Sequence, residues 1–322
     1  MMLASLKVII KKNGKYYENI NKYEIRKTFL EIAMISIECP EDQKILKEIE
    51  EKIIRKVDLG FNPQILEVLD RVDARREEIE ALREALGKGL VTRLFGLGNS
   101  TYYGRLRAGK FTDFSEIIFR LGFGPAKIYI LSLALFFVKP GKEFVDLAAR
   151  SFLISFLGKM IAKKMGMTEE EIKKVEMGGL FLKIGKVFML LYESCEEKKL
   201  DEDFISLYYP YIGLKVVDFF KLPEFLKEVI SFSSLQLEEN SFSISSIIEL
   251  AHSEVDKSFK KFGKFVIQSP MPDEEGMVLT TLGADLAHQF EAVGLGVFLE
   301  VLPTLSPRQK ILALRRAQTS NK

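Results

Sequence analysis

The stretch that decides the fold is rich in glycine and apolar residues, and it reads Gly178-Gly179-Leu180-Phe181-Leu182-Lys183-Ile184-Gly185-Lys186. The two side chains at its centre are Leu182 and Lys183. An aliphatic side chain has no atom that coordinates a metal, and a protonated ammonium repels one. The centre of this stretch therefore carries no metal ligand, and the neighbouring elements must indicate what kind of site it belongs to.

Length and composition indicate a folded protein. The chain has 322 residues, of which 47% are hydrophobic and 29% charged, which suits one large domain or a few ordinary ones. Its formal net charge is only +2, so nucleic acid is not indicated as a partner. Cys39 and Cys195 belong to no CxxC pair, which is typical of a reducing, cytoplasmic setting.

No membrane span is expected. The N-terminus, Met1 to Lys12, lacks the long apolar core of a signal peptide. The most apolar run, Ile128 to Val138, has about half of the roughly 20 residues that a membrane span requires. This run therefore predicts a buried helix.

The N-terminal residues predict a β-hairpin followed by two helices. An Asn-Gly pair between β-rich runs is a strong hairpin signal, and here the runs and the turn are Val8-Ile9-Ile10-Lys11-Lys12-Asn13-Gly14 and Tyr16-Tyr17. The first helix carries one apolar face, formed by Ile25, Phe29, Ile32 and Ala33. The second begins at Pro40 with acids in its first turn, and its apolar stripe is Ile45, Ile49, Ile53 and Ile54.

This N-terminal part loosely resembles an ATP-cone, the nucleotide-sensing module of ribonucleotide reductases. The matching residues are Val8-Ile9-Ile10-Lys11-Lys12-Asn13-Gly14, where that module tends to show a VxKRDG run. The resemblance implies that Lys11, Lys12 and Gly14 hold nucleotide phosphates. The spacing after Gly14 is one residue longer than in the module, and Glu24 falls near a place that usually has a base. The other interpretation is a surface hairpin with solvated lysines.

From about residue 60 the pattern is wholly helical. Pro63 begins a stripe of Ile65, Leu66, Val68 and Leu69. One further helix is predicted from the helical spacing of Ile79, Leu82, Leu86, Leu90 and Leu94. Asn99-Ser100 is interpreted as the polar end and cap that follows it.

Several runs in this helical part resemble HDOD domains, the HD-related output domains of the HD phosphohydrolase superfamily. Arg93-Leu94-Phe95-Gly96-Leu97-Gly98-Asn99-Ser100-Thr101-Tyr102-Tyr103-Gly104 resembles the family's RLLRLANSAYYG element, and residues 117–132 its AIxxLGxxxLxxLxLS segment. Residues 179–186 correspond to its HD-derived helix, which reads GLLHDIGK in the superfamily, residues 208–213 to its HxxVG helix start, and residues 222–226 to its LPxxI turn. The resemblance implies a mainly α fold: an HDOD-like helical bundle with a small N-terminal α+β appendage.

The same resemblance implies that the metal ligands of the superfamily are replaced. Catalytic HD sites bind metal through converging His and Asp side chains. The corresponding positions here are Arg150, Leu182, Lys183, Tyr209, Ser233, Ser234 and His252. The chain has only 2 histidines, so one imidazole stands where several ligands are needed. The resemblance therefore predicts a non-enzymatic protein with no metal and no cofactor.

Replacement of ligands by cations would change what the pocket attracts. If Arg150 and Lys183 face inward, the pocket holds an anion such as a nucleotide phosphate, with Tyr209 and His252 beside it. The alternative is that both cations reach solvent or pair with local acids such as Glu176. Tyr209 and His252 would then be packing residues.

The C-terminal third predicts a loop, a closing helix and an extension. Ser231 to Ser246 is serine-rich and predicts a surface loop, and Ile247 to Phe262 a helix. The run 269–276 predicts a linker, after which the extension is expected to be helical. A last helix from Ser306-Pro307 carries cations without acids, namely Arg308, Lys310, Arg315 and Arg316. It would meet an acidic partner, nucleic acid or a membrane surface, or dock on the body with its charges solvated.

Three segments follow from these patterns: a hairpin-plus-helices segment at 1–59, an HDOD-like domain at 60–265 and a helical extension at 266–322. The expected function is a non-catalytic bacterial signal-transduction regulator that acts through a protein partner. A nucleotide-sensing regulator that binds a phosphorylated ligand is the alternative. A metal-dependent phosphohydrolase is a third class, and the replaced ligands argue against it.

Overall fold

The mainly helical fold predicted from the sequence is confirmed. The computed structural model describes residues 10–12, 15–17, 39–71, 73–99, 111, 113–232, 243–269, 287, 290–291 and 293–303. Its helices are α2 (Pro40–Glu48), α3 (Arg76–Leu86), α4 (Lys88–Gly98), α6 (Phe114–Leu121), α7 (Phe123–Phe136), α8 (Lys142–Lys164), α9 (Glu169–Phe181), α10 (Ile184–Glu196), α11 (Glu202–Phe219), α12 (Phe225–Phe232) and α13 (Ile244–Phe262).

Shorter elements complete the described chain. A π-helical turn, η1 (Ile49–Ile53), and a 3-10 turn, η2 (Ile54–Lys56), follow α2 directly, and the 3-10 segments η3 (Pro63–Asp70) and η4 (Gly296–Phe298) lie further along. The strands are β1 (Ile10–Lys12), β2 (Lys15–Tyr17), β3 (Phe265–Ser269) and β4 (Leu299–Pro303).

The helix starts follow from local chemistry. Pro40 opens α2 in its first turn, as predicted, because a proline there sacrifices no helical hydrogen bond. The Asn62 side chain accepts a hydrogen bond from the Gln64 amide at the start of η3. At α9 the capping box is reciprocal, because Thr168 accepts from the Glu171 amide and the Glu171 carboxylate accepts from the Thr168 amide.

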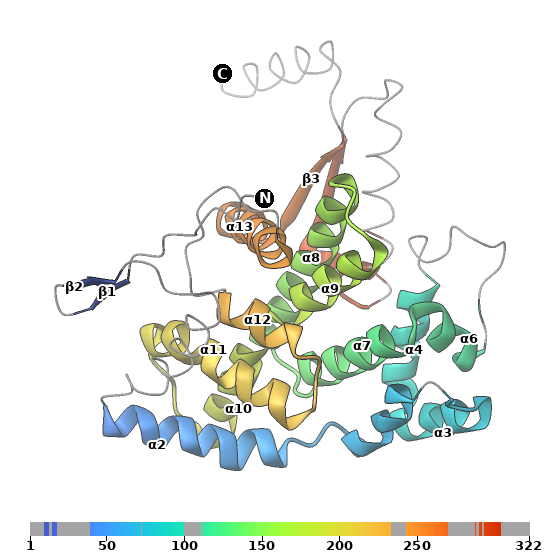
Figure 1. Cartoon of the computed structure of the whole chain (residues 1–322), viewed down its shortest axis with the longest axis horizontal. Coiled ribbons are helices and arrows are strands. Elements are labelled where there is room, and N and C mark those ends of the chain that lie inside the picture. Colours follow the sequence, from blue (N-terminus) through green and yellow to red (C-terminus); the bar gives the residue numbers. More distant parts are fainter. Residues whose placement is uncertain are drawn as a thin grey trace, which may run out of the picture.

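The core lies where α7, α8, α9 and α10 meet. α8 packs along both α9 and α13, which also contact each other, while α10 packs on α11 (Figure 1). α7 is buried from Ala126 to Phe136, which confirms the buried helix predicted from its apolar run. Such continuous burial explains its uniformly apolar sequence.

Two glycines in the stretch 178–186 allow these helices to approach each other closely. A Cβ at Gly179 would lie 2.6 Å from the Cα of Ser155 in α8. A Cβ at Gly185 would lie 1.9 Å from the carbonyl oxygen of Tyr209 in α11. Any larger residue at either position would collide with backbone, so these glycines set the α8–α9 and α10–α11 contacts.

Several sequence predictions are confirmed. β1 and β2 pair antiparallel, with Ile10 opposite Tyr17 and Lys12 opposite Lys15, as expected for the predicted hairpin. Ile49, Ile53 and Ile54 are buried, as their stripe predicts. Asn99 ends α4, and its side chain accepts from the Phe111 amide and donates to the Phe111 carbonyl.

Other predictions are corrected. The single helix expected through Leu94 is two helices, because the chain breaks at Gly87 with φ of 74°. The segment expected to start a helix at Tyr208 lies inside α11, which begins at Glu202 and includes Pro210. The parallel pairing of β3 with β4, with Phe265 opposite Leu299, was not foreseen.

Some predictions lie outside the described residues. They are the helix carrying Ile25 and Phe29, Gly14, the Ser233–Ser234 pair, most of the linker and the last helix from Ser306. Within the described part of the chain, no single helix is long and apolar enough to cross a membrane, although α6 and α7, bent by 109°, pass that test as a pair.

Candidate functional site

The site is built at the junction of α9 and α10. Leu182 is the C-terminal cap of α9 and is buried in the core. Lys183 follows as the N-terminal cap of α10, and only 7% of its side chain is exposed. The junction therefore turns an aliphatic side chain into the core and a lysine toward the helices that pack beside it.

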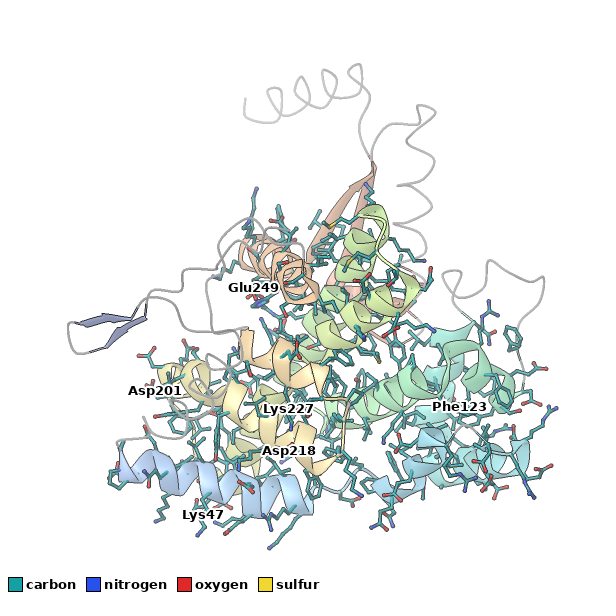
Figure 2. The ribbon with its side chains drawn as sticks, viewed as in Figure 1. Lys47, Phe123, Asp201, Asp218, Lys227 and Glu249 are labelled. Carbon is teal, nitrogen blue, oxygen red and sulfur yellow. The ribbon has the colours of Figure 1, made fainter. Side chains whose placement is uncertain are left out.

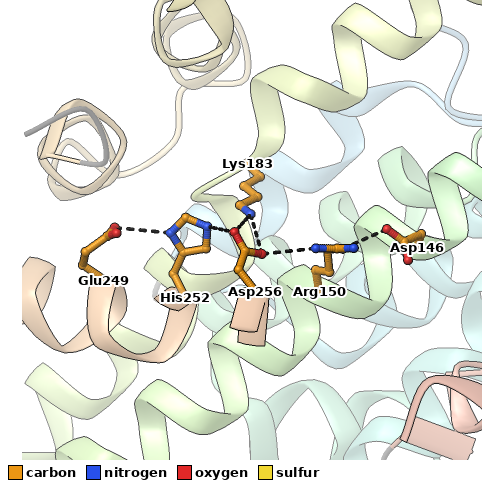
Figure 3. A network of polar contacts seen from close by, with 6 residues as sticks. All are labelled: Asp146, Arg150, Lys183, Glu249, His252 and Asp256. Atoms are coloured by element: carbon orange, nitrogen blue, oxygen red, sulfur yellow. Dashed lines mark hydrogen bonds and ion pairs between the residues drawn. The ribbon is translucent and has the colours of Figure 1, made fainter. Parts of the chain in front are cut away.

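A single carboxylate on α13, that of Asp256, receives this lysine. The Lys183 Nζ lies 3.2 Å from Asp256 Oδ1 and 3.3 Å from Oδ2. Arg150 of α8 donates from Nη1 to Asp256 Oδ1 at 3.2 Å. The His252 Nε2 lies 2.9 Å from Asp256 Oδ2 (Figure 3). Three basic side chains from three places in the sequence thus converge on one acid.

Further contacts surround this centre. Arg150 Nε donates to Asp146 Oδ2 at 2.8 Å, and the guanidinium lies 4.3 Å from the centroid of the Phe259 ring. His252 Nδ1 lies 3.4 Å from Glu249 Oε2 (Figure 3). We call Asp146, Arg150, Lys183, Glu249, His252 and Asp256 the Asp256 cluster.

Tyr209 lies beside Lys186, which follows Lys183 in α10. It is 8% exposed, and the Lys186 Nζ lies 4.8 Å from the centroid of its ring. Of the candidate residues read from the sequence, Arg150, Lys183 and His252 therefore meet at Asp256, and Tyr209 contacts the lysine one turn after Lys183. The backbone of Lys11 and Lys12 lies in β1.

Burial and pairing act against each other in the pKa values of the cluster. Burial lowers the pKa of Lys183 to about 8, although the charge of Asp256 opposes the shift. Burial alone would raise the pKa of Asp256, but its contacts with His252 and Lys183 outweigh burial and hold it well below the usual value. Burial also opposes protonation of His252, yet contacts with Asp256 and Glu249 raise its pKa overall. The arrangement therefore stabilises an ionised carboxylate among cations.

These residues do not fit a divalent metal. Among the residues that the structure describes, no three His, Cys, Asp or Glu side chains form a group that would hold a metal ion. Around Asp256, an ammonium and a guanidinium occupy the directions from which further ligands would approach. A metal needs ligands with free electron pairs, and neither cation offers one.

A second buried ion pair lies nearby in the core. Glu176, which the sequence offered as a partner for Arg150 or Lys183, instead faces Lys159 of α8, with Nζ and Oε2 2.5 Å apart. The Tyr129 hydroxyl donates to the same carboxylate. Burial lowers the pKa of Lys159 to about 8, against the charge of Glu176. Together with Tyr129, this ion pair links α7, α8 and α9.

Asp146, Glu249 and Asp256 are the site residues that the sequence patterns missed. Asp146 lies four residues before Arg150, Glu249 three residues before His252 and Asp256 four residues after it, so each shares a helix face with a candidate. This helical spacing is the feature of the sequence that could have identified them. The pairing of Asp256 with Arg150 and Lys183 depends on how α13 packs on α8 and α9, which spacing alone does not give.

Comparison with known proteins agrees with this fold. The family model of the HDOD domain matches residues 61–232. A Shewanella amazonensis SB2B structure described as a "putative metal-dependent phosphohydrolase" is 15% identical, with a TM-score of 0.55 over 79% of this chain and 100% of its own. At this identity the likeness shows the fold alone. No curated protein matches the chain.

Two more solved structures are similar at lower TM-scores. A second Shewanella amazonensis SB2B protein, described as a "putative phosphohydrolase", is 15% identical over 78% of this chain and 96% of its own, with a TM-score of 0.47. An HDOD domain protein with unknown function from Geobacter sulfurreducens is 17% identical over 93% of this chain and 96% of its own, with a TM-score of 0.43.

Proposed function

This chain belongs to the HDOD family, and we propose that it is a non-catalytic bacterial signal-transduction protein that acts by binding a protein partner. The observation that supports the proposal is the contact of Lys183 with Asp256 at 3.2 Å. Where the resemblance to the HD superfamily implies a metal ligand, this chain has a cation, and that cation is paired with a carboxylate of the same chain. A site of this kind has neither a metal-activated water nor a free electrostatic centre for a phosphate ester.

Metal content and hydrolysis test this proposal together. Protein purified from cells grown with added manganese and iron is expected to carry far less than one metal ion per chain. It is also expected not to hydrolyse bis(p-nitrophenyl) phosphate or nucleotides with Mn²⁺ present. The matched control is Asp256→Asn. Near-stoichiometric metal, together with hydrolysis that this variant abolishes, would overturn the proposal; hydrolysis that the variant retains would come from a contaminant.

A nucleotide-sensing regulator is the second candidate function. It is favoured by the β1–β2 hairpin, whose strand β1 contains Lys11 and Lys12, two of the residues that carry the ATP-cone resemblance. A thermal-shift screen with nucleotides and cyclic dinucleotides tests it, with and without divalent metal. Stabilisation lost in Lys11→Ala/Lys12→Ala would assign the ligand to the hairpin, and loss in Arg150→Ala/Lys183→Ala would assign it to the Asp256 cluster. No shift at millimolar nucleotide removes this candidate.

A further inference from the structure

The N-terminal helix α2 and the turns after it lie against α10 and α11, along the lower edge of the bundle in the view of Figure 1. This segment precedes residues 61–232, which the HDOD family model matches. It is joined to them through residues 57–60, where Gly60 adopts a φ of 76° and its amide donates to Asp58 Oδ1 at 2.8 Å. A short turn therefore separates the segment from the domain on which it packs.

Two tyrosines of the domain hold the segment by hydrogen bonds to carboxylates. The Tyr208 hydroxyl of α11 donates to Asp42 Oδ2 at 3.0 Å, and the Tyr192 hydroxyl of α10 donates to Glu48 Oε2 at 2.7 Å. Both tyrosines are almost fully buried, whereas Asp42 and Glu48 are partly exposed, so each bond is partly shielded from water.

The rest of the contact between this segment and α10 and α11 is apolar at its centre and charged at its rim. Leu46, Ile49, Ile53 and Ile54 are buried. At the rim, Lys215 of α11 lies 3.4 Å from Glu50, and Lys52 lies 3.4 Å from Glu196 of α10. An apolar centre with a polar rim is the composition of an interface between proteins, and a helix laid in a groove is a common form of it.

The opposite face of α2 takes no part in this contact. Lys47 points away from α10 and α11 (Figure 2), and 74% of its side chain is exposed. Its ion pair with Glu51, at 3.9 Å, is also on the exposed side. Residues of α2 that contact α10 and α11 can therefore be substituted separately from residues of α2 that face solvent.

We propose that the face of α10 and α11 around Tyr192, Tyr208 and Lys215 is a helix-binding groove, which α2 occupies within the same chain and a partner protein occupies in its place. The partner fits as an amphipathic helix. It presents carboxylates at the positions of Asp42 and Glu48 and Leu or Ile at the positions of residues 46, 49 and 53. Because α2 is tethered, it competes at a high effective concentration, so a separate partner must bind the groove tightly to displace it. This inference rests on the proposed action through a protein partner.

The test uses the full chain and a fluorescent peptide with the sequence of residues 39–57. Wild type is expected to bind the peptide weakly, because α2 holds the groove closed and lowers the apparent affinity by the open fraction. The variant Asp42→Asn/Glu48→Gln keeps the shape of α2 but weakens both tyrosine bonds. It is expected to bind the peptide at least tenfold more tightly than wild type, measured by fluorescence anisotropy. The exposed-face variant Lys47→Ala/Glu51→Ala should bind as wild type does.

Three controls separate the outcomes. Adding Tyr192→Phe/Tyr208→Phe to the loosened variant should abolish the gain, and a peptide carrying Asn and Gln in place of Asp42 and Glu48 should bind no variant. A second loosened variant, Ile49→Ala/Ile53→Ala, weakens the apolar anchors instead. If neither loosened variant binds the peptide better than wild type, or if both become dimers in light scattering without binding it, the proposal is wrong. Metal-dependent hydrolysis would refute the proposed function without changing these binding results.

Discussion

The Lys183 ammonium lies within 3.3 Å of both carboxylate oxygens of Asp256, so a residue at the α9–α10 junction and a residue of α13 form the centre of the site. Arg150 and His252 share the same carboxylate from other directions. Asp256 contacts three basic side chains, and each of these side chains balances only part of the charge of Asp256. The members of the cluster therefore do not contribute equally to the stability of the protein. This asymmetry can be measured.

Removal of the Asp256 charge should cost more stability than removal of the Lys183 charge. Asp256→Asn leaves the ammonium of Lys183, whose side chain is 7% exposed, without a carboxylate, and an uncompensated buried charge costs about 3 kcal/mol. Lys183→Met leaves Asp256 paired with Arg150 and His252 and should cost about 1 kcal/mol or less. Urea unfolding measures both values.

The double variant Lys183→Met/Asp256→Asn provides the control for this comparison. The loss of unfolding free energy in the double variant should be smaller than the sum of the losses in the single variants by at least about 1 kcal/mol. The reason is that the lysine left without a carboxylate by the loss of Asp256 is itself removed. Additive effects would mean that the two side chains do not interact in solution.

The stability of the protein should depend on pH through His252. Its pKa is raised in the folded protein above the ordinary value of 6.5, so the folded state binds the proton more tightly than the unfolded chain. This contribution is fully present below pH 6.5 and is lost as pH rises through the folded pKa. The difference in unfolding free energy between wild type and His252→Gln should therefore shrink between about pH 6 and pH 8. A difference that stays constant, or grows with pH, would contradict the contacts with Asp256 and Glu249.

Gly185→Ala should be among the most destabilising small substitutions. The added Cβ would lie 1.9 Å from the Tyr209 carbonyl oxygen and 2.8 Å from the Gly213 amide nitrogen, so α10 and α11 would have to separate. Overpacking of this kind costs about 3 kcal/mol. The matched control is Gly89→Ala in α4, where nothing lies within 4 Å of the new Cβ and the helix should gain about 0.5–1 kcal/mol. Equal thermal stabilities of the two variants would show that the close contact is absent.

The sequence predicted those features of the fold that depend on nearby residues. The pairing of β1 with β2, the start of α2 at Pro40 and the burial of α7 follow from turn chemistry, capping and apolar content over a few residues. The break at Gly87 was missed because Ile79, Leu82, Leu86 and Leu94 keep helical spacing across it. Only the positive φ of Gly87 separates α3 from α4.

The site could be predicted only in part, and for a physical reason. The resemblance to HDOD domains located Arg150, Lys183 and His252, which do lie together. The carboxylate that pairs with them could not be found in this way, because Asp256 and Lys183 are 73 positions apart and meet only when α13 packs on α8 and α9. The β3–β4 pair was missed for the same reason, since its strands are joined by a long segment and their register is set by pairing.

The Asp256 cluster is expected not to bind a divalent metal, and paramagnetic broadening of the histidine resonances tests this most directly. The chain has 2 histidines, so the imidazole spectrum is simple, and His252→Gln assigns it. On titration with Mn²⁺, the His252 signal is expected to broaden no more than that of His288. Selective broadening of His252 that saturates at one equivalent of Mn²⁺ would place a metal beside Asp256 and contradict the account.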